Sequence, residues 1–166
     1  MKKEKPQVAV LMGSDSDWPV MRGAVDQLRE FGVACDVQVM SAHRTPDRVS
    51  SFVVEAPKRG IRVFVVGAGA AAHLAGVVAA HTTLPVIGVP LDATSLKGMD
   101  ALLATVQMPS GVPVATVAVG GAENAGILAA QILGVADARI AGAMKRFKAA
   151  MAKKVAAKNA RLQEQL

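Results

Sequence analysis

The sequence predicts an α/β fold in which a doubly wound parallel sheet carries helices on both faces. Short apolar runs, typical of strands buried on both faces, alternate with amphipathic stretches long enough to form helices. Gly-rich turns separate the runs, and strands that alternate with helices in this way favour parallel pairing. The chain has 166 residues and no linker that would divide it, so we expect a single domain.

The first half of the chain contains four of the expected strands. The first run is apolar throughout and leads into the segment 13–17, whose Ser and Asp residues can cap the helix that follows. Pro46 suits the first turn of the second helix, because proline has no amide hydrogen to lose and its φ is already helical. We expect strands over 8–12, 33–40, 62–66 and 86–89, a helix that ends near 31, and helices over 46–58 and 71–80.

The second half continues this alternation and ends in a long helix. We expect a short helix over 98–106, a strand over 112–119 and a helix over 123–133. From about 137 to 163, apolar residues recur at helical spacing. They are Ile140, Met144, Phe147, Met151 and Val155. We therefore divide the chain into a short basic N-terminal extension (1–6), an α/β domain that carries the site (7–134) and a basic C-terminal helix (135–166) that contacts other subunits.

Charge and cysteine content narrow the classes of partner. The net charge of +6 lies in the tail, because 137–166 carry +6, 1–5 carry +2 and 6–136 carry −2. The tail has no set of aromatic residues interleaved with its basic ones, and no zinc or helix-turn-helix spacing occurs. We therefore interpret the tail as a solvated helix face and predict no nucleic-acid partner. The single Cys35 excludes an intramolecular disulfide, which fits a reducing cytoplasm.

One stretch, 61–80, is apolar enough to raise the question of a membrane span. A Gly-rich break and His73 interrupt it, and Pro85 follows soon after. A buried strand, a turn and a buried helix explain the stretch better, so we predict no membrane partner. The helix over 71–80 is apolar nearly all round, and a domain of this size has little room to bury it. We therefore expect a homo-oligomer.

Three loops follow the first three strands and are the candidate site. In an open parallel sheet, ligands bind beyond the carboxyl ends of the strands, near the switch in strand order. The loop 13–17 offers hydroxyl groups for a phosphate and carboxylates for sugar hydroxyls, although Ser and Asp at such a turn are often plain caps. The loop 67–73 is Gly-rich, which allows the backbone to approach a flat ligand closely.

The loop 41–44 places an acid/base residue beside a fixed cation at a helix N-terminus, an end that attracts anions. His43 can take or give a proton near neutral pH, and Arg44 can bind an anionic substrate. A loop histidine that only bonds the backbone is the alternative interpretation. His73 and His81 are not spaced as a metal pair, and no Cys, His and carboxylate cluster occurs, so we predict no metal site.

A dinucleotide site is a further alternative. Residues 67–72 match G-x-G-x-x-A after a strand, and Asp92 lies about 20 residues further on. The pattern follows the third strand rather than the first, and Asp92 lies past Pro90 rather than at a strand tip. A redox or regulatory module that binds a dinucleotide therefore remains a hypothesis from a different class of function.

Motifs at these loops resemble a known family, the class I N5-carboxyaminoimidazole ribonucleotide (N5-CAIR) mutases, or PurE family, of purine biosynthesis. The similarity extends in order over roughly 7–133. The matching pieces are MGSDSDW (12–18), SAHRTPDR (41–48), GAGAAAHLAG (67–76), LPVIGVP (84–90), VQMPSGVPVATVAVG (106–120) and NAGILAAQIL (124–133).

The resemblance implies an isomerase that converts N5-CAIR to 4-carboxy-5-aminoimidazole ribonucleotide (CAIR) in de novo IMP biosynthesis. It also implies a homo-octamer of a three-layer α/β/α fold, which we expect to be flavodoxin-like, without metal, ATP or organic cofactor. His43 matches the catalytic acid/base of the family. Residues at the other matching positions are expected to bind or surround the ribonucleotide: Gly13, Ser14, Ser16, Asp17, Ser41, Ala42, Arg44, Gly69, Ala70, His73 and Leu74.

The chain departs from the family pattern at a few positions. Ala70 and Ala115 stand where the family usually has Gly, Ala75 stands where it usually has Pro, and the turn 120–124 is about two residues short. An added methyl at Ala70 crowds the loop or requires a φ that Ala disfavours. Direct carboxylation of aminoimidazole ribonucleotide by CO2, from the same superfamily, remains the alternative reaction. Arg44 favours the mutase, because the direct carboxylases usually carry Lys there.

Overall fold

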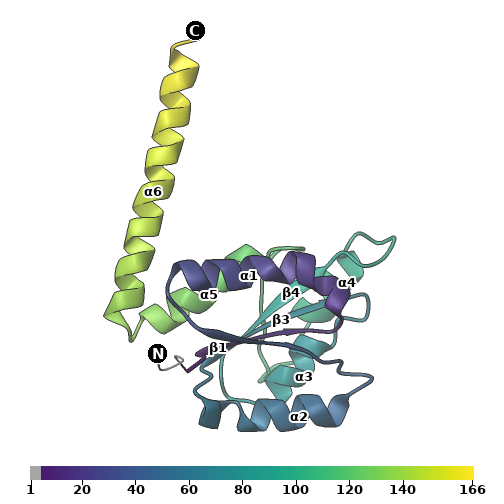
Figure 1. Cartoon of the computed structure of the whole chain (residues 1–166). Helices are drawn as coiled ribbons and strands as arrows, with labels where there is room; N and C mark the ends of the chain where they lie inside the picture. Colours follow the sequence, from purple (N-terminus) through teal and green to yellow (C-terminus); the bar gives the residue numbers. More distant parts are fainter. Residues whose placement is uncertain (1–4) are drawn as a thin grey trace.

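The computed structural model describes residues 5–166, so the first four residues of the predicted extension 1–6 lie outside it. Strands and helices alternate along the chain, as expected (Figure 1). The elements are β1 (Val8–Met12), η1 (Asp15–Asp17), α1 (Trp18–Glu30), β2 (Cys35–Val39), α2 (Pro46–Glu55), η2 (Pro57–Arg59), β3 (Val63–Gly69), α3 (Leu74–Ala80), β4 (Val86–Leu91), α4 (Met99–Val106), β5 (Ala115–Thr116), α5 (Ala122–Gly134) and α6 (Ala138–Gln163).

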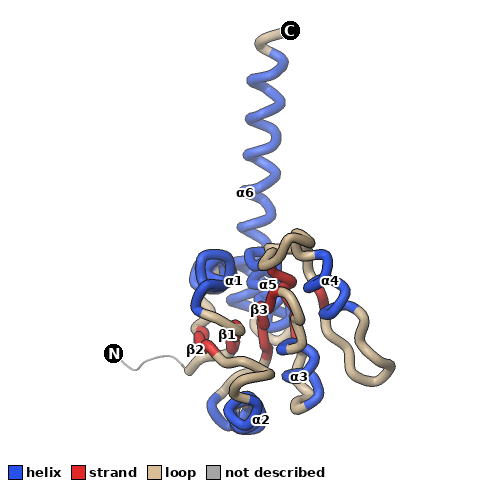
Figure 2. The backbone as a smooth tube through the Cα atoms, turned by 90° about the vertical axis from the view of Figure 1, so that its right-hand side faces the viewer, coloured by secondary structure: helices blue, strands red, loops and turns tan. Residues whose placement is uncertain are grey.

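The sheet is parallel throughout, with the strand order β2-β1-β3-β4-β5. This order confirms the predicted doubly wound, flavodoxin-like α/β fold. Helices α1 and α5 lie against one face of the sheet and α2 and α3 against the other, so the domain has three layers (Figure 2). The direction of strand order reverses between β1 and β3, which pair directly, with Met12 beside Gly67.

Two apolar cores fill the spaces between the layers. Every residue of β1 is buried, and its side chains alternate between the core under α1 and α5 and the core over α2 and α3. The pleat of a strand imposes this alternation. Small residues allow the layers to approach closely: at Gly67, for example, an added Cβ would overlap the sulfur of Met21 from α1. The scarcity of aromatic residues in the sequence reflects this close packing.

Several predicted boundaries were wrong near glycine and proline. The segment 67–69, predicted to be a turn, is the end of β3, because Gly67, Ala68 and Gly69 pair with Val89, Pro90 and Leu91 of β4. Strand β4 was expected to end before Pro90 but continues through it, since Leu91 pairs with Gly69.

The fifth strand is much shorter than expected. The prediction was 112–119, whereas only Ala115 and Thr116 pair with β4. Pro113 precedes the paired residues in this edge strand. Because proline has no amide hydrogen to donate to a neighbouring strand, it limits the pairing on this side.

Helix α3 begins at Leu74, three residues later than predicted. Ala70 has a φ of 52°, in the left-handed region, and the amide of His73 bonds the carbonyl of Ala71, so the chain turns before the helix starts. Leu74, Ala75 and Val78 are buried against the sheet. The domain itself therefore covers part of the apolar surface that led us to expect an oligomer.

The predicted long C-terminal helix is present as α6. It extends away from the domain, and only its first turns contact the body (Figure 1). Ile140 and Met144 are buried, and the ring of Phe147 meets the ring of Phe31 edge to face at 5.3 Å between centroids. Over residues 5–166, none of the helices combines the length and the apolar character needed to cross a bilayer.

Candidate active site

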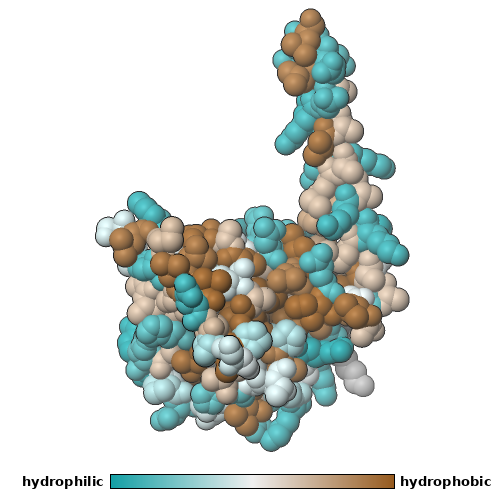
Figure 3. Space-filling view, turned by 180° about the vertical axis from the view of Figure 1, so that it is seen from behind, coloured by the Kyte–Doolittle hydropathy of each residue, from teal (hydrophilic) through white to brown (hydrophobic). Residues whose placement is uncertain are grey.

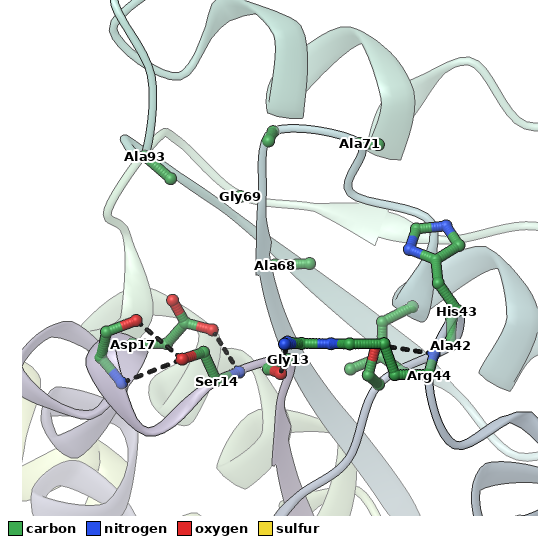
Figure 4. A pocket seen from close by; sticks show the side chains of 14 residues that line it. Gly13, Ser14, Asp17, Ala42, His43, Arg44, Ala68, Gly69, Ala71 and Ala93 are labelled. Carbon is green, nitrogen blue, oxygen red and sulfur yellow. Dashed lines mark hydrogen bonds between the residues drawn. The ribbon is translucent and has the colours of Figure 1, made fainter.

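A cavity of about 250 Å³ lies at the carboxyl ends of β1, β2 and β3, next to the switch in strand order. The first three loops meet there, as the sequence predicts. Figure 4 shows Ser14 and Asp17 on one side of the cavity, His43 and Arg44 on the other, and the end of β3 between them. The lining residues are Gly13, Ser14, Ser16, Asp17, Ser41, Ala42, His43, Arg44, Ala68, Gly69, Ala70, Ala71, Leu74 and Ala93.

Eleven of the twelve residues proposed from the sequence line this cavity. The exception is His73, which contacts His43 but is not among the lining residues. Ala68 and Ala71 belong to the candidate loop 67–73 but were not singled out in it, and sequence reasoning missed Ala93. Ala93 could have been found, because it follows β4 and the carboxyl end of β4 lies at the same edge of the sheet.

The loop after β1 is held by a reciprocal capping box, in which two side chains satisfy each other's backbone amides. The Oδ2 atom of Asp17 accepts from the amide of Ser14 at 3.0 Å, and Ser14 Oγ accepts from the amide of Ser16 at 3.3 Å. Ser16 Oγ lies 2.8 Å from Ser14 Oγ. The caps therefore hold two hydroxyl groups and one carboxylate at the cavity.

Burial of the Asp17 side chain raises the pKa of its carboxyl group above the ordinary value of 3.8, and the charge of Asp15 acts in the same direction. Hydrogen bonds from the amides of Ser14 and Gly13 oppose this shift. A carboxyl group that is expensive to desolvate, yet kept at the cavity wall, is typical of a binding residue.

The loop after β2 is folded by hydroxyl groups. Thr45 Oγ1 accepts from the amide of Ser41 at 2.9 Å, donates to the Ser41 carbonyl at 3.0 Å, and leaves Ser41 Oγ to accept from the amide of Arg44 at 3.2 Å. The Arg44 side chain extends across the cavity toward the first loop, where Nη2 lies 3.4 Å from the carbonyl oxygen of Gly13 (Figure 4). Within residues 5–166 it forms no ion pair, so its charge is available to an anion.

The two histidines at the site contact each other. Nε2 of His43 lies 2.9 Å from Nδ1 of His73, and the rings meet edge to face at 4.9 Å between centroids. One of these two nitrogens must donate and the other accept, and the tautomers of the two rings decide which does so. Among residues 5–166 the hydrogen-bond partner of the His43 ring is thus another side chain, whereas the alternative interpretation expected the backbone.

The third loop turns sharply at Ala70, which lines the cavity with a positive φ of 52°. This confirms that the position requires a backbone conformation that alanine disfavours. No group of three or more metal-binding side chains gathers in the part of the chain that the structure describes. His81 lies elsewhere and bonds the carbonyl of Val77.

Comparison with known proteins identifies the family. A family model described as AIR carboxylase matches residues 7–154. The chain belongs to the AIR carboxylase family. This assignment confirms the resemblance carried by the loop motifs, because the PurE proteins named below match the chain over nearly its whole length.

Several relatives share about half of their residues with this chain. The N5-carboxyaminoimidazole ribonucleotide mutase of Mycobacterium tuberculosis is 54% identical over 96% of this chain and 92% of the relative. The mutase of Pyrococcus horikoshii is 51% identical over 99% and 93%. The phosphoribosylaminoimidazole carboxylase of Candida albicans is 49% identical over 98% of this chain but only 28% of that longer protein.

Solved structures of the family have the same fold. A Treponema denticola PurE superposes with a TM-score of 0.85 and 31% identity, over 95% of this chain and 98% of that chain. A PurE2 variant from the same organism gives a TM-score of 0.87 at 29% identity, over 96% and 99%.

Proposed function

We propose that this chain converts N5-CAIR into CAIR in purine biosynthesis, and so acts as an isomerase. The main support is that mutases from M. tuberculosis and P. horikoshii match nearly the whole chain at 54% and 51% identity. The cavity supports the same reaction, because it places a histidine, an arginine and a cluster of hydroxyl groups around one small space. These are the groups that a phosphorylated, carboxylated imidazole nucleotide requires.

In the proposed reaction His43 moves a proton between two atoms of the substrate. A protonated His43 gives its proton to the carbamate nitrogen as the N–C bond breaks and CO2 leaves. The ring carbon C4 then attacks CO2, and the neutral imidazole takes the proton that C4 loses. The proton returned to His43 replaces the one it gave, so the reaction is a balanced isomerisation that consumes no cofactor or ATP.

The surrounding loops would hold the substrate and the CO2. We assign ribose hydroxyls to Asp17 and an anionic group to Arg44, with the hydroxyl groups of Ser14 and Ser16 beside them. The end of β3 and the turn at Ala70 would form the wall around the imidazole. CO2 must stay close to C4 and away from water between the two steps, which a small cavity favours.

Two alternative functions remain to be tested. Direct carboxylation is the reaction that the description of the family, AIR carboxylase, names, but the relatives that this chain matches over nearly their whole length are mutases. A dinucleotide module is less well supported, because the first two glycines of the G-x-G-x-x-A pattern lie inside β3 rather than in a turn that opens a helix.

The test is to incubate the purified chain with N5-CAIR, without ATP, metal or bicarbonate, and to follow CAIR absorbance. We expect rapid formation of CAIR. Conversion only of aminoimidazole ribonucleotide with added bicarbonate would instead identify a direct carboxylase. Tight binding of NAD(H) or a flavin, with no turnover, would identify the module.

We also propose that the enzyme works in the cytoplasm as a homo-octamer to which the C-terminal helix contributes contacts. Large apolar side chains remain uncovered on α4 and its preceding loop and on the outer half of α6. They are Leu96, Met99, Leu103, Val106, Met151, Val155 and Leu162. Figure 3 shows several hydrophobic areas on one face of the molecule and more along α6. Association of subunits would cover such areas.

A further inference from the structure

The loop that joins β4 to α4, residues 92–98, is held in a strained conformation beside the cavity. Within residues 5–166, two non-glycine residues have a positive φ: Ala70 at 52° and Lys97 at 54°. Ala70 follows the end of β3, and Lys97 belongs to the loop 92–98. These two loops touch, because a Cβ added to Gly69 would lie 2.5 Å from the Cβ of Ala93. Strain of this kind persists only where surrounding contacts enforce it.

Thr94 is the centre of those contacts. Its hydroxyl donates to Oδ2 of Asp100 at 2.8 Å and accepts from the amide of Leu96 at 3.1 Å. Its carbonyl accepts from the amide of Lys97 at 3.2 Å. One side chain therefore joins the first turn of α4 to the middle of the loop, next to the residue with the positive φ.

Asp100 holds this arrangement from a half-buried position on α4. Its Oδ2 atom accepts from Thr94, whereas its Oδ1 atom is shielded from solvent and has no hydrogen-bond partner among residues 5–166. A carboxylate kept in such a place loses part of its hydration, and its one side-chain bond goes to the loop. Asp100 is not among the residues that line the cavity, so it acts on the substrate through the loop.

We propose that Asp100 and Thr94 form a positioning pair, which presses the loop 92–98 against the end of β3 and so fixes the Ala93 side of the substrate pocket. The proposal rests on the proposed function, because the pocket it shapes is the one assigned to N5-CAIR. Loss of the pair lets the loop move away from β3. Part of the free energy of substrate binding is then used to order the loop again. Binding weakens, while the chemical step at His43 changes little.

The test compares breaking and conserving substitutions at both residues. Thr94→Val keeps the shape but removes the hydroxyl, and Asp100→Ala removes the acceptor; we expect each to raise KM for N5-CAIR about tenfold with kcat within about twofold of wild type. Thr94→Ser and Asp100→Asn keep a donor and an acceptor, respectively, so both should restore KM to within about twofold. The variant with Thr94→Val and Asp100→Ala combined should be no worse than either single change.

Thr105→Val is the matched control. Thr105 is buried on the same helix, and its hydroxyl donates to the carbonyl of Ala101 at 2.7 Å, away from the cavity. Loss of that bond should lower the melting temperature and leave KM unchanged. If KM rises as much in Thr105→Val as in Thr94→Val, the rise reflects general destabilisation of the fold rather than the positioning pair. That result would overturn the proposal.

Amide hydrogen exchange of residues 93–98, measured without substrate, separates this proposal from the proposed function. We expect faster exchange in Thr94→Val and wild-type exchange in Thr94→Ser, whether or not the chain turns over N5-CAIR. Unchanged exchange in Thr94→Val would show that the positioning pair does not hold the loop. Faster exchange with an unchanged KM would show that the pair holds the loop but does not shape the substrate pocket. Either result would overturn the proposal. A wild-type chain that makes no CAIR would refute the proposed function instead.

Discussion

His43 and His73 lie within hydrogen-bonding distance of each other, but only His43 lines the cavity. We expect His43→Asn to lower kcat by at least about a hundredfold, because general acid–base catalysis contributes on that scale. His73→Asn should lower it less than about tenfold, since that residue only supports the ring of His43. Steady-state rates of CAIR formation measure both.

Substrate-dependent thermal shifts are the control for this pair. Both variants should still be stabilised by N5-CAIR, because Arg44 and the first loop are unchanged. The assignment fails if His43→Asn keeps its turnover, or if His73→Asn suffers the larger loss.

The carboxylate of Asp17 is expected to bind the substrate but to lower the stability of the folded chain at neutral pH. Its carboxyl pKa is raised in the folded state, so the folded chain binds this proton more tightly than the unfolded chain. The stability from that proton is present below the unfolded value of 3.8 and is lost as pH rises through the folded pKa. Asp17→Asn carries no charge at any pH. It should therefore unfold at a higher denaturant concentration than wild type at pH 7, and this difference should shrink as pH falls through the raised pKa of the folded state and be gone below 3.8.

The same variant should bind the substrate more weakly, since an amide is a poorer acceptor for two ribose hydroxyls than a carboxylate. Asp15→Asn is the control on the same turn, and we expect a smaller change in both measurements because Asp15 is exposed and does not line the cavity. If Asp17→Asn unfolds at a lower denaturant concentration than wild type at pH 7, the predicted effect of the buried carboxylate is wrong.

In the turn between β3 and α3, Ala70 has a positive φ that alanine disfavours, and its replacement by glycine tests this strain. A left-handed φ costs an L-residue about 1–2 kcal/mol, whereas glycine adopts it freely. Part of the gain is offset because glycine makes the unfolded chain more flexible. Ala70→Gly should therefore raise the free energy of unfolding by about 0.5–1 kcal/mol. Urea denaturation measures it.

Ala71→Gly is the matched control, because Ala71 is the next residue, also lines the cavity and has no positive φ. It should be neutral or destabilising. Destabilisation by Ala70→Gly that equals that of Ala71→Gly would mean that Ala70 is not strained.

Elements whose pattern depends on their own residues could be predicted from the sequence. β1 was located to the residue, because five buried apolar residues end at a glycine. Elements that depend on a neighbour could not. Gly67 and Gly69 read as turn residues, yet they continue β3 because β4 lies alongside to pair with them and because Met21 leaves no room for a side chain at Gly67.

The site could be predicted for a different reason. Each loop has its own signature, and parallel strands bring their carboxyl ends to one edge, so adjacency followed from the strand order. The contact of His43 with His73, the hydrogen bond from Thr94 to Asp100 and the place of Ala93 depend on loop conformations that no spacing encodes.

At the scale of the whole molecule, the proposed octamer explains why α6 extends from the body with an uncovered apolar stripe. Sedimentation should give a particle of eight copies of the 17.1 kDa chain. Leu103→Glu places a charge on the exposed face of α4, where the side chain is 48% exposed, and should produce smaller species while the isolated fold persists. Wild-type protein that sediments as a monomer would contradict the proposed assembly.

The claim that CO2 is transferred within one enzyme-bound substrate can be tested most directly by isotope retention. N5-CAIR labelled with carbon-13 in its carbamate is mixed with excess enzyme and unlabelled bicarbonate, and the CAIR from one turnover is analysed by mass. We predict that CAIR keeps the label, because the cavity holds the released CO2 until C4 attacks it. CAIR that carries carbon from the bicarbonate pool would contradict the mutase and identify a direct carboxylase.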